Sequence, residues 1–224
     1  MVGTSDTHVV IAAFNEAQVI RGVVGEVAAQ GYPVVVVDDG SRDDTAASAR
    51  MPGVTVLRHA INLGQGAALQ TGIEYALCRG ADHIVTFDAD GQHACDDIPA
   101  LVAALATHDI ALGSRFLGKQ VVGASRSRKL FLRTATTLSN RMSGMKLTDA
   151  HCGLRAFRAS AAPALCITQD RMAHASELLR KIHTSGLRVV EVPVTVKYTA
   201  HSMRKGQGGL QAIRILFDYF FRPS

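Results

Sequence analysis

Two carboxylates stand one residue apart at the point where an apolar stretch of this sequence ends. Residues 84–87 are Ile-Val-Thr-Phe, and Asp88 and Asp90 follow them. Carboxylates at the edge of an apolar core repel each other and are costly to desolvate, so we expect a cation beside them. Two carboxylates on one short turn suit Mg²⁺ or Mn²⁺, and Gln92 adds a neutral oxygen. The sequence therefore predicts Asp88, Asp90 and Gln92 as ligands of a divalent metal ion that would also bind diphosphate oxygens.

A second acidic pair follows another apolar run. Asp38 and Asp39 come directly after the four valines at 34–37. Ser41 or Asp43 is suited to capping a helix ahead, but that role leaves the two aspartates unexplained. A carboxylate in this place can accept hydrogen bonds from a nucleobase N–H or from ribose hydroxyls. The pair therefore indicates a nucleotide-binding group.

The elements that must position these residues alternate regularly along the first half of the chain. Strands are expected at 8–12, 34–37, 54–57, 84–87 and 110–112, and helices at 16–29, 43–50, 67–77 and 96–106. Short β-branched runs that alternate with helices predict an α/β fold, with a mainly parallel central sheet and helices on both faces. Ligands of such sheets bind outside the carboxyl ends of the strands, where the acidic residues of this sequence gather.

Length and composition favour one large folded domain. The chain has 224 residues, of which 47% are hydrophobic and 19% charged, so a substantial core is expected and global disorder is excluded. No apolar run approaches the roughly 18–20 residues that span a bilayer, and the first ten residues do not resemble a signal peptide, so we expect a cytoplasmic protein. The four cysteines form no Cys-x-x-Cys pair, and no zinc site is expected.

One segment of the chain is strongly basic. The net charge is +5, yet residues 110–148 contain no acid. The basic residues of this segment are Arg115, Lys119, Arg126, Arg128, Lys129, Arg133, Arg141 and Lys146. Such a local field indicates an anionic partner, which can be phosphate, nucleic acid or a membrane surface. Phe116 and Phe131 are the only aromatic residues in the segment, and this scarcity argues against nucleic-acid binding.

Seven stretches of the chain, in order, resemble family 2 glycosyltransferases of the GT-A type. Within that family they are similar to the dolichyl- and polyprenyl-phosphate sugar transferases typified by dolichol-phosphate mannose synthase. The stretches are IAAFNE (11–16), VDDGSRDDT (37–45), NLGQGAALQTG (62–72), DADGQH (88–93), GSR (113–115), TDAHCGLRAF (148–157) and VVEVPVTVKY (189–198). The resemblance implies a single GT-A catalytic domain over residues 1–209.

The resemblance also implies roles for single residues. Asp90, Arg115 and Glu177 would be catalytic, and Asp149 and Arg155 would shape the acceptor side. The nucleotide-sugar would be held by Phe14, Glu16, Val37, Asp39, Asp88, Ala89, Lys197 and Lys205. The stretch 198–207 differs in length from the mannose enzymes, so the donor sugar and its nucleotide, GDP or UDP, stay open.

The implied reaction is a single inverting displacement that moves the sugar from the metal-bound nucleotide to an acceptor oxygen. A lipid phosphate is already ionised, whereas a sugar hydroxyl needs a base, for which His174 and Glu177 are the candidates. The basic loop at 115–133, with Arg126 and Arg133 as acceptor-binding residues, favours polyprenyl phosphate because arginine can bind phosphate through two parallel hydrogen bonds. The alternatives are extension of a saccharide chain at a hydroxyl and a non-catalytic nucleotide-sugar-binding module.

Residues 210–224 are predicted to form an amphipathic helix. Gln211, Arg214, Asp218 and Arg222 fall on one narrow stripe, and nearly all the other residues are apolar. Such a wide apolar face must be covered by the domain core, by a small membrane-protein partner or by the membrane interface. We expect the membrane or a partner, and hence a peripheral enzyme on the cytoplasmic face of the membrane.

Overall fold

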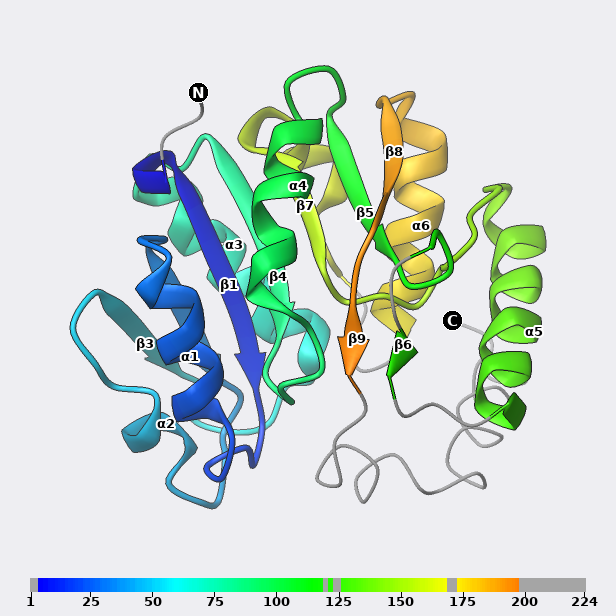
Figure 1. The fold of residues 1–224 in the computed structure, drawn as a ribbon. Coiled ribbons are helices and arrows are strands. Elements are labelled where there is room, and N and C mark those ends of the chain that lie inside the picture. The colour runs from blue at the N-terminus through cyan, green and yellow to red at the C-terminus, as the bar shows by residue number, and fades with distance from the viewer. Residues whose placement is uncertain (1–3, 119–120, 123–125, 169–172, 198–224) are drawn as a thin grey trace.

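A computed structural model describes residues 4–118, 121–122, 126–168 and 173–197 (Figure 1). Its centre is a seven-stranded sheet in the order β3-β2-β1-β4-β7-β5-β8. These strands are β1 (Thr7–Ala13), β2 (Val34–Asp38), β3 (Val54–Arg58), β4 (His83–Asp88), β5 (Ile110–Ser114), β7 (Arg155–Arg158) and β8 (Val189–Pro193). Only β7 runs antiparallel to its neighbours, β4 and β5. The predicted α/β fold with a mainly parallel sheet is confirmed.

Helices cover both faces of this sheet, as the sequence predicted. In Figure 1, α1 (Ile20–Ala29) and α4 (Ile98–Ala104) lie in front of the strands, and α3 (Gln65–Cys78) and α6 (Ala173–Ser185) lie behind them. The other elements are α2 (Thr45–Ser48), α5 (Arg126–Ser143), the 3-10 turns η1 (Thr4–Asp6), η2 (Cys95–Asp97) and η3 (Ala159–Leu165), and the strands β6 (Val121–Val122) and β9 (Val196–Lys197).

The run of valines in β2 packs on both faces of the sheet. Val34 and Val36 belong to the core under α1 and α4, whereas Val35 and Val37 belong to the core under α3 and α6. Successive side chains of a strand point to opposite faces, so a strand covered on both sides needs an unbroken apolar run. All four valines are at most 1% exposed, and the acidic residues come only where the run leaves the core.

Three predicted helices are shorter than expected, and the one expected over 96–106 is Ile98–Ala104, preceded by the 3-10 turn η2. The helix expected over 16–29 begins at Ile20, because Asn15 adopts a left-handed conformation with φ of 54° and the Glu16 N–H donates to Thr45 Oγ1 at 2.8 Å. The helix expected over 43–50 is Thr45–Ser48. The basic segment expected as a loop at 115–133 was also assigned wrongly, since α5 begins within it at Arg126.

The carboxyl ends of β1, β2, β4 and β5 meet at one edge of the sheet, the lower edge in Figure 1, and β7 begins at the same edge. This edge collects the acidic strand ends that the sequence singled out. None of the helices in the described ranges has the length and hydropathy needed to cross a membrane. The helix predicted over 210–224, and Lys205, lie outside the described residues.

Candidate active site

Asp88, Asp90 and Gln92 lie together on the turn that follows β4. Asp90 Oδ1 accepts a hydrogen bond from the Gln92 N–H at 3.0 Å, and its Oδ2 accepts one from Gln92 Nε2 at 2.6 Å. Asp88 Oδ2 lies 2.9 Å from Nε2 of His93. Within the described ranges no group of three or more His, Cys, Asp or Glu side chains is arranged to hold a metal ion. The turn nevertheless fits Mg²⁺ or Mn²⁺, since such ions often use one or two carboxylates and complete their shell with substrate phosphates and water.

The two carboxylates of this turn differ in their electrostatic support. Burial raises the pKa of Asp90, and the charges of Asp88 and Glu16 raise it further. Burial also opposes ionisation of Asp88, but the hydrogen bond and charge of His93 and the charge of Arg155 outweigh it and lower the pKa of Asp88. The ionised form of Asp90 is therefore less well supported than that of Asp88, and a cation at this turn would favour it.

His93 is buried and orients Asp88. Its side chain is 3% exposed, and its ring meets the edge of Phe87 at a centroid distance of 5.7 Å. His93 belongs to the DADGQH stretch, but its place in the sequence does not indicate a role. A histidine five residues after a strand-end aspartate is a weak signal, because only the turn brings the two side chains together.

Asp39 lies at the carboxyl end of β2, but its carboxylate binds other groups of the protein itself. Its carboxylate accepts hydrogen bonds from the N–H groups of Leu63 and Gly64, at 2.9 and 2.7 Å, and lies 2.8 Å from Nδ1 of His59. Nε2 of His59 in turn lies 3.0 Å from Thr71 Oγ1 of α3. Asp39 thus fastens the loop between β3 and α3 to the end of β2. A nucleotide contact for Asp39 stays a prediction.

The remaining residues predicted to hold the nucleotide-sugar lie in different surroundings. Glu16 is buried beside α2, and Phe14 is 40% exposed at the end of β1. The side chain of Val37 is wholly buried in the core under α3, and Ala89 is 6% exposed in the core on the other face. Phe14 thus presents a side chain at the surface of this edge, whereas the side chain of Val37 packs in the core.

Strand β9 links the acidic turn after β4 to the basic segment. The Lys197 N–H donates to the Gln92 carbonyl at 2.8 Å, and Val196 bridges to His93. On its other side β9 pairs with β6, Val196 opposite Val121. Lys197 is therefore placed beside the predicted metal ligand Gln92, although the two residues are far apart in sequence.

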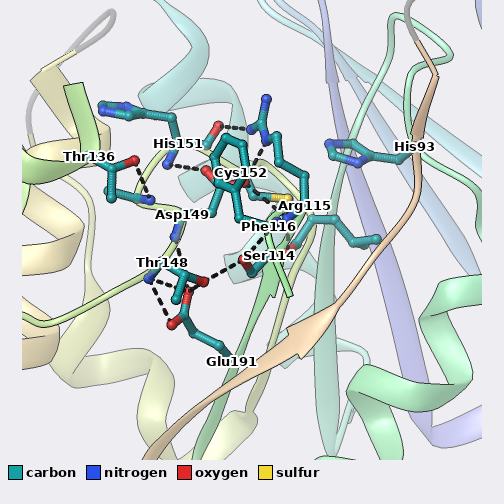
Figure 2. Close-up of polar contacts among 12 residues, drawn as sticks. His93, Ser114, Arg115, Phe116, Thr136, Thr148, Asp149, His151, Cys152 and Glu191 are labelled. Carbon is teal, nitrogen blue, oxygen red and sulfur yellow. Dashed lines mark hydrogen bonds and ion pairs between the residues drawn. The ribbon is translucent and has the colours of Figure 1, made fainter. Parts of the chain in front are cut away.

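Arg115 and Asp149 form a buried ion pair at the end of β5 (Figure 2). Nε of Arg115 binds Asp149 Oδ2 at 2.5 Å, the Arg115 N–H donates to the same oxygen at 3.2 Å, and Nη2 donates to the His151 carbonyl at 3.0 Å. Burial lowers the pKa of His151, whose ring is held by α5 through Ser139 Oγ and the Ala135 carbonyl. Arg115 and Asp149, which were predicted as site residues from separate stretches of the sequence, are thus in direct contact.

Arg133 lies over the aromatic ring of Phe116, the residue next to Arg115. Its guanidinium carbon lies 5.4 Å from the centroid of the Phe116 ring, and Phe116 follows Arg115 directly in the chain. Arg155, at the start of β7, is buried, and its Nε donates to the Cys152 carbonyl at 2.9 Å. Arg126 is the first residue of α5, and its side chain lies outside the description.

The carboxylate of Glu177 binds neighbouring residues of the protein. Its carboxylate accepts hydrogen bonds from the Thr168 N–H, at 3.1 and 3.2 Å, and lies 2.8 Å from Lys181 Nζ. These contacts hold the turn after η3 against α6. The side chain of His174, the other candidate base, lies outside the described residues. The catalytic role of Glu177 stays a prediction.

Two further residues lie at this edge that were not predicted from the sequence, Gly153 and Glu191. Gly153 packs against the carboxylate of Asp88, and Glu191 of β8 binds the segment that carries Asp149. A lone acid inside the apolar strand 189–193 is a signal that could have pointed to Glu191. Gly153 has no comparable signal, because its neighbour is distant in sequence.

Comparisons with known proteins agree with this geometry. The model of the family described as "Glycosyl transferase family 2" matches residues 8–165. The UDP-N-acetylglucosamine–dolichyl-phosphate N-acetylglucosaminyltransferase of Methanococcus voltae is 31% identical over 238 residues, covering 96% of this chain and 93% of the relative. The undecaprenyl-phosphate mannosyltransferase of Micrococcus luteus is 32% identical over 212 residues, covering 90% of this chain and 87% of the relative.

A solved structure shares the fold. Glucosyl-3-phosphoglycerate synthase from Mycobacterium tuberculosis, in complex with Mn²⁺, uridine diphosphate and phosphoglyceric acid, superposes with a TM-score of 0.70 at 20% identity. The match covers 98% of this chain and 80% of that one, and it identifies the fold as GT-A. The acidic turn after β4, the sheet that carries it and the family match over residues 8–165 lead to one conclusion: the chain belongs to glycosyl transferase family 2 and is a glycosyltransferase.

Proposed function

We propose that this enzyme transfers a sugar from a nucleotide-sugar to a polyprenyl phosphate, with a divalent metal ion and with inversion at the anomeric carbon. The observation that carries the proposal is the pairing of two kinds of charge at one sheet edge. An acidic turn follows β4, and an arginine cluster with Arg115 and Arg133 follows β5, with β9 between the two segments. Two relatives that cover most of this chain are named for transfer to dolichyl or undecaprenyl phosphate.

The donor side of the proposal rests on the turn after β4. Asp88, Asp90 and Gln92 would hold Mg²⁺ or Mn²⁺, which when bound neutralises charge on the departing nucleoside diphosphate. His93 keeps Asp88 in place, and Lys197 lies beside Gln92, where its ammonium can add positive charge next to the diphosphate. Phe14 presents its exposed ring at the end of β1 to the nucleotide.

The acceptor side of the proposal rests on the arginine cluster. A phosphate monoester of a lipid is already ionised, so its oxygen can attack the anomeric carbon without a base, while the bond from that carbon to the diphosphate oxygen breaks. Arg115 is oriented by Asp149, and Arg133 is oriented by Phe116, so both guanidinium groups are preorganised for an anion. The carboxylate of Glu177 is bound to Thr168 and Lys181, which favours the phosphate acceptor over a hydroxyl that needs a base.

The first half of α5 supports contact with the membrane that holds such a lipid. Leu130 is 68% exposed and Phe131 is 40% exposed, and both lie between the basic residues Lys129 and Arg133. Exposed apolar side chains beside basic ones are typical of helices that lie in the interface of an anionic membrane. We therefore propose a peripheral enzyme whose α5 faces the cytoplasmic surface of the membrane.

The test is a panel of UDP- and GDP-sugars incubated with Mn²⁺ or Mg²⁺ and undecaprenyl phosphate in vesicles, with the products identified by mass. A glycosyl phosphoryl lipid is expected from at least one donor, and its anomeric configuration should be opposite to that of the donor. EDTA should abolish transfer reversibly, and Asp90→Ala should abolish it while circular dichroism stays native. Transfer to a sugar hydroxyl in place of the lipid phosphate, or full activity with the metal shown to be removed, would contradict the proposal.

A further inference from the structure

Glu191 is a half-buried charged residue on β8, the edge strand beside β5. It lies opposite Leu112 of β5. Both of its carboxylate oxygens accept from the Thr148 N–H at 2.9 Å, and Oε1 also accepts from Thr148 Oγ1 at 2.8 Å and from the Asp149 N–H at 3.1 Å (Figure 2). A carboxylate on an edge strand is ordinarily solvated, whereas this one binds two consecutive residues of a distant loop.

The contact with the Thr148 hydroxyl orders a chain of hydrogen bonds. An ionised carboxylate can only accept, so the Thr148 hydroxyl donates to Glu191. The Thr148 oxygen is then left to accept from the Ser114 hydroxyl, 2.6 Å away. Ser114 Oγ accepts in turn from the Phe116 N–H at 3.2 Å. The carboxylate therefore sets which hydroxyl donates between Ser114 and Thr148, and the chain of hydrogen bonds connects β8 to Phe116, whose ring packs against the guanidinium of Arg133.

The contact with the Asp149 N–H forms a second branch. Asp149 is 2% exposed, and its carboxylate binds both the main chain and the side chain of Arg115. Glu191 holds the main chain of Asp149 from the other side, so the aspartate that orients Arg115 is itself oriented by Glu191. The two branches separate at residues 148 and 149 and end at Arg133 and Arg115.

We propose that Glu191 is a positioning residue for the acceptor anion, acting through Thr148 on Arg133 and through Asp149 on Arg115. This inference rests on the proposed function, in which the two arginines receive the phosphate of the acceptor. Glu191 itself touches neither substrate. Its contribution is to preorganise two guanidinium groups that lie on different segments of the chain, which reduces the cost of ordering them when the anion binds.

The experiment compares Glu191→Ala, Thr148→Val, Arg133→Ala and the control Glu26→Gln, which removes an exposed carboxylate on α1. Calorimetry with Mn²⁺ measures the Kd for UDP and for GDP, and geranyl phosphate serves as the probe for the acceptor site. Glu191→Ala is expected to weaken geranyl phosphate at least about tenfold, the loss of one charge-assisted hydrogen bond, and to leave the Kd of the nucleotide unchanged. If the role of Glu191 were purely structural, Glu191→Ala would weaken the binding of the nucleotide and of geranyl phosphate together.

Thr148→Val removes one hydroxyl and keeps both main-chain bonds to Glu191, so it tests one branch even if Glu191→Ala does not fold. In the Thr148→Val background, Arg133→Ala should cost much less affinity for geranyl phosphate than in the wild type, because the branch to Arg133 is already broken. If the losses of affinity for geranyl phosphate in Thr148→Val and Arg133→Ala are additive, and Glu191→Ala leaves the Kd of geranyl phosphate unchanged, the role of Glu191 is overturned. The proposed function would still stand. If the wild type binds UDP or GDP but not geranyl phosphate, the proposed acceptor and the role of Glu191 both fail.

Discussion

A methyl group on Gly153 would lie 2.2 Å from Oδ2 of Asp88, the carboxylate oxygen that also contacts His93. The Gly153 carbonyl accepts from Thr86 Oγ1 at 2.8 Å, so the loop before β7 is fixed against β4 and cannot easily retreat. The acidic turn therefore needs glycine at position 153, because any larger residue must displace the carboxylate.

The first prediction follows from this contact. Gly153→Ala should push Asp88 away from its present position and lower transfer at least about tenfold, the effect of losing one well-placed charge contact. Binding of Mn²⁺ with UDP or GDP, measured by calorimetry, should weaken in parallel. Gly25→Ala is the matched control, since a methyl group there meets nothing within 4 Å and alanine favours the helix α1. Full nucleotide binding in Gly153→Ala would show that the carboxylate does not need its present place.

The second prediction concerns the buried pair of Arg115 and Asp149. Asp149→Ala should lower the free energy of unfolding by about 3 kcal/mol, because Arg115 would stay buried without its partner. Urea unfolding monitored by circular dichroism measures the change. Asp109→Ala, which breaks the exposed pair with Arg188, should change stability far less. Equal effects of the two substitutions would mean that Arg115 reaches solvent when Asp149 is removed.

The third prediction concerns pH. Burial lowers the pKa of His8 and of His83, and the charges of Arg79 and Arg158 add to the shift at each site. The unfolded chain then binds more protons than the folded one, so stability is complete above about pH 6.5 and is lost as the pH falls below it. Urea unfolding at pH 7.5 and pH 5.5 should show this loss, and the double variant His8→Gln and His83→Gln should show less of it.

A contribution from carboxylates would appear at lower pH and is separable from that of the histidines. The hydrogen bonds and charge of Arg188 lower the pKa of Asp109 to about 2, so its stabilisation is lost only below about pH 4. If stability is constant between pH 7.5 and pH 5.5 in the wild type, protonation of the half-buried His8 and His83 does not oppose folding.

The fourth prediction concerns the exposed part of α5. Leu130→Ser with Phe131→Ser should reduce sedimentation with vesicles that contain anionic lipid, because the apolar contact with the membrane interface is lost. Transfer to undecaprenyl phosphate should fall more than transfer to geranyl phosphate, which is accessible without a bilayer. Since both side chains are exposed, the melting temperature should be nearly unchanged. If the variant sediments with vesicles as the wild type does, α5 does not contact the membrane.

The parallel half of the sheet and the position of the acidic turn can be predicted from the amino-acid sequence alone. The unbroken valines of β2 indicate a strand covered on both faces, and Asp88, Asp90 and Gln92 are close in sequence, so one local turn is enough to bring them together. Local periodicity and local spacing carry this information because both are set by the geometry of the backbone within a few residues.

The contacts that hold the two charged halves of the site depend on the folded arrangement of the strands. β7 enters the sheet antiparallel between β4 and β5, and this insertion places Gly153 on Asp88 and Arg155 beside Thr86. Glu191 meets Thr148 and Asp149 because β8 pairs with β5. Contacts of this kind join residues that are tens of positions apart, and their partners are set by strand order and register, which the spacing of residues along the chain does not encode.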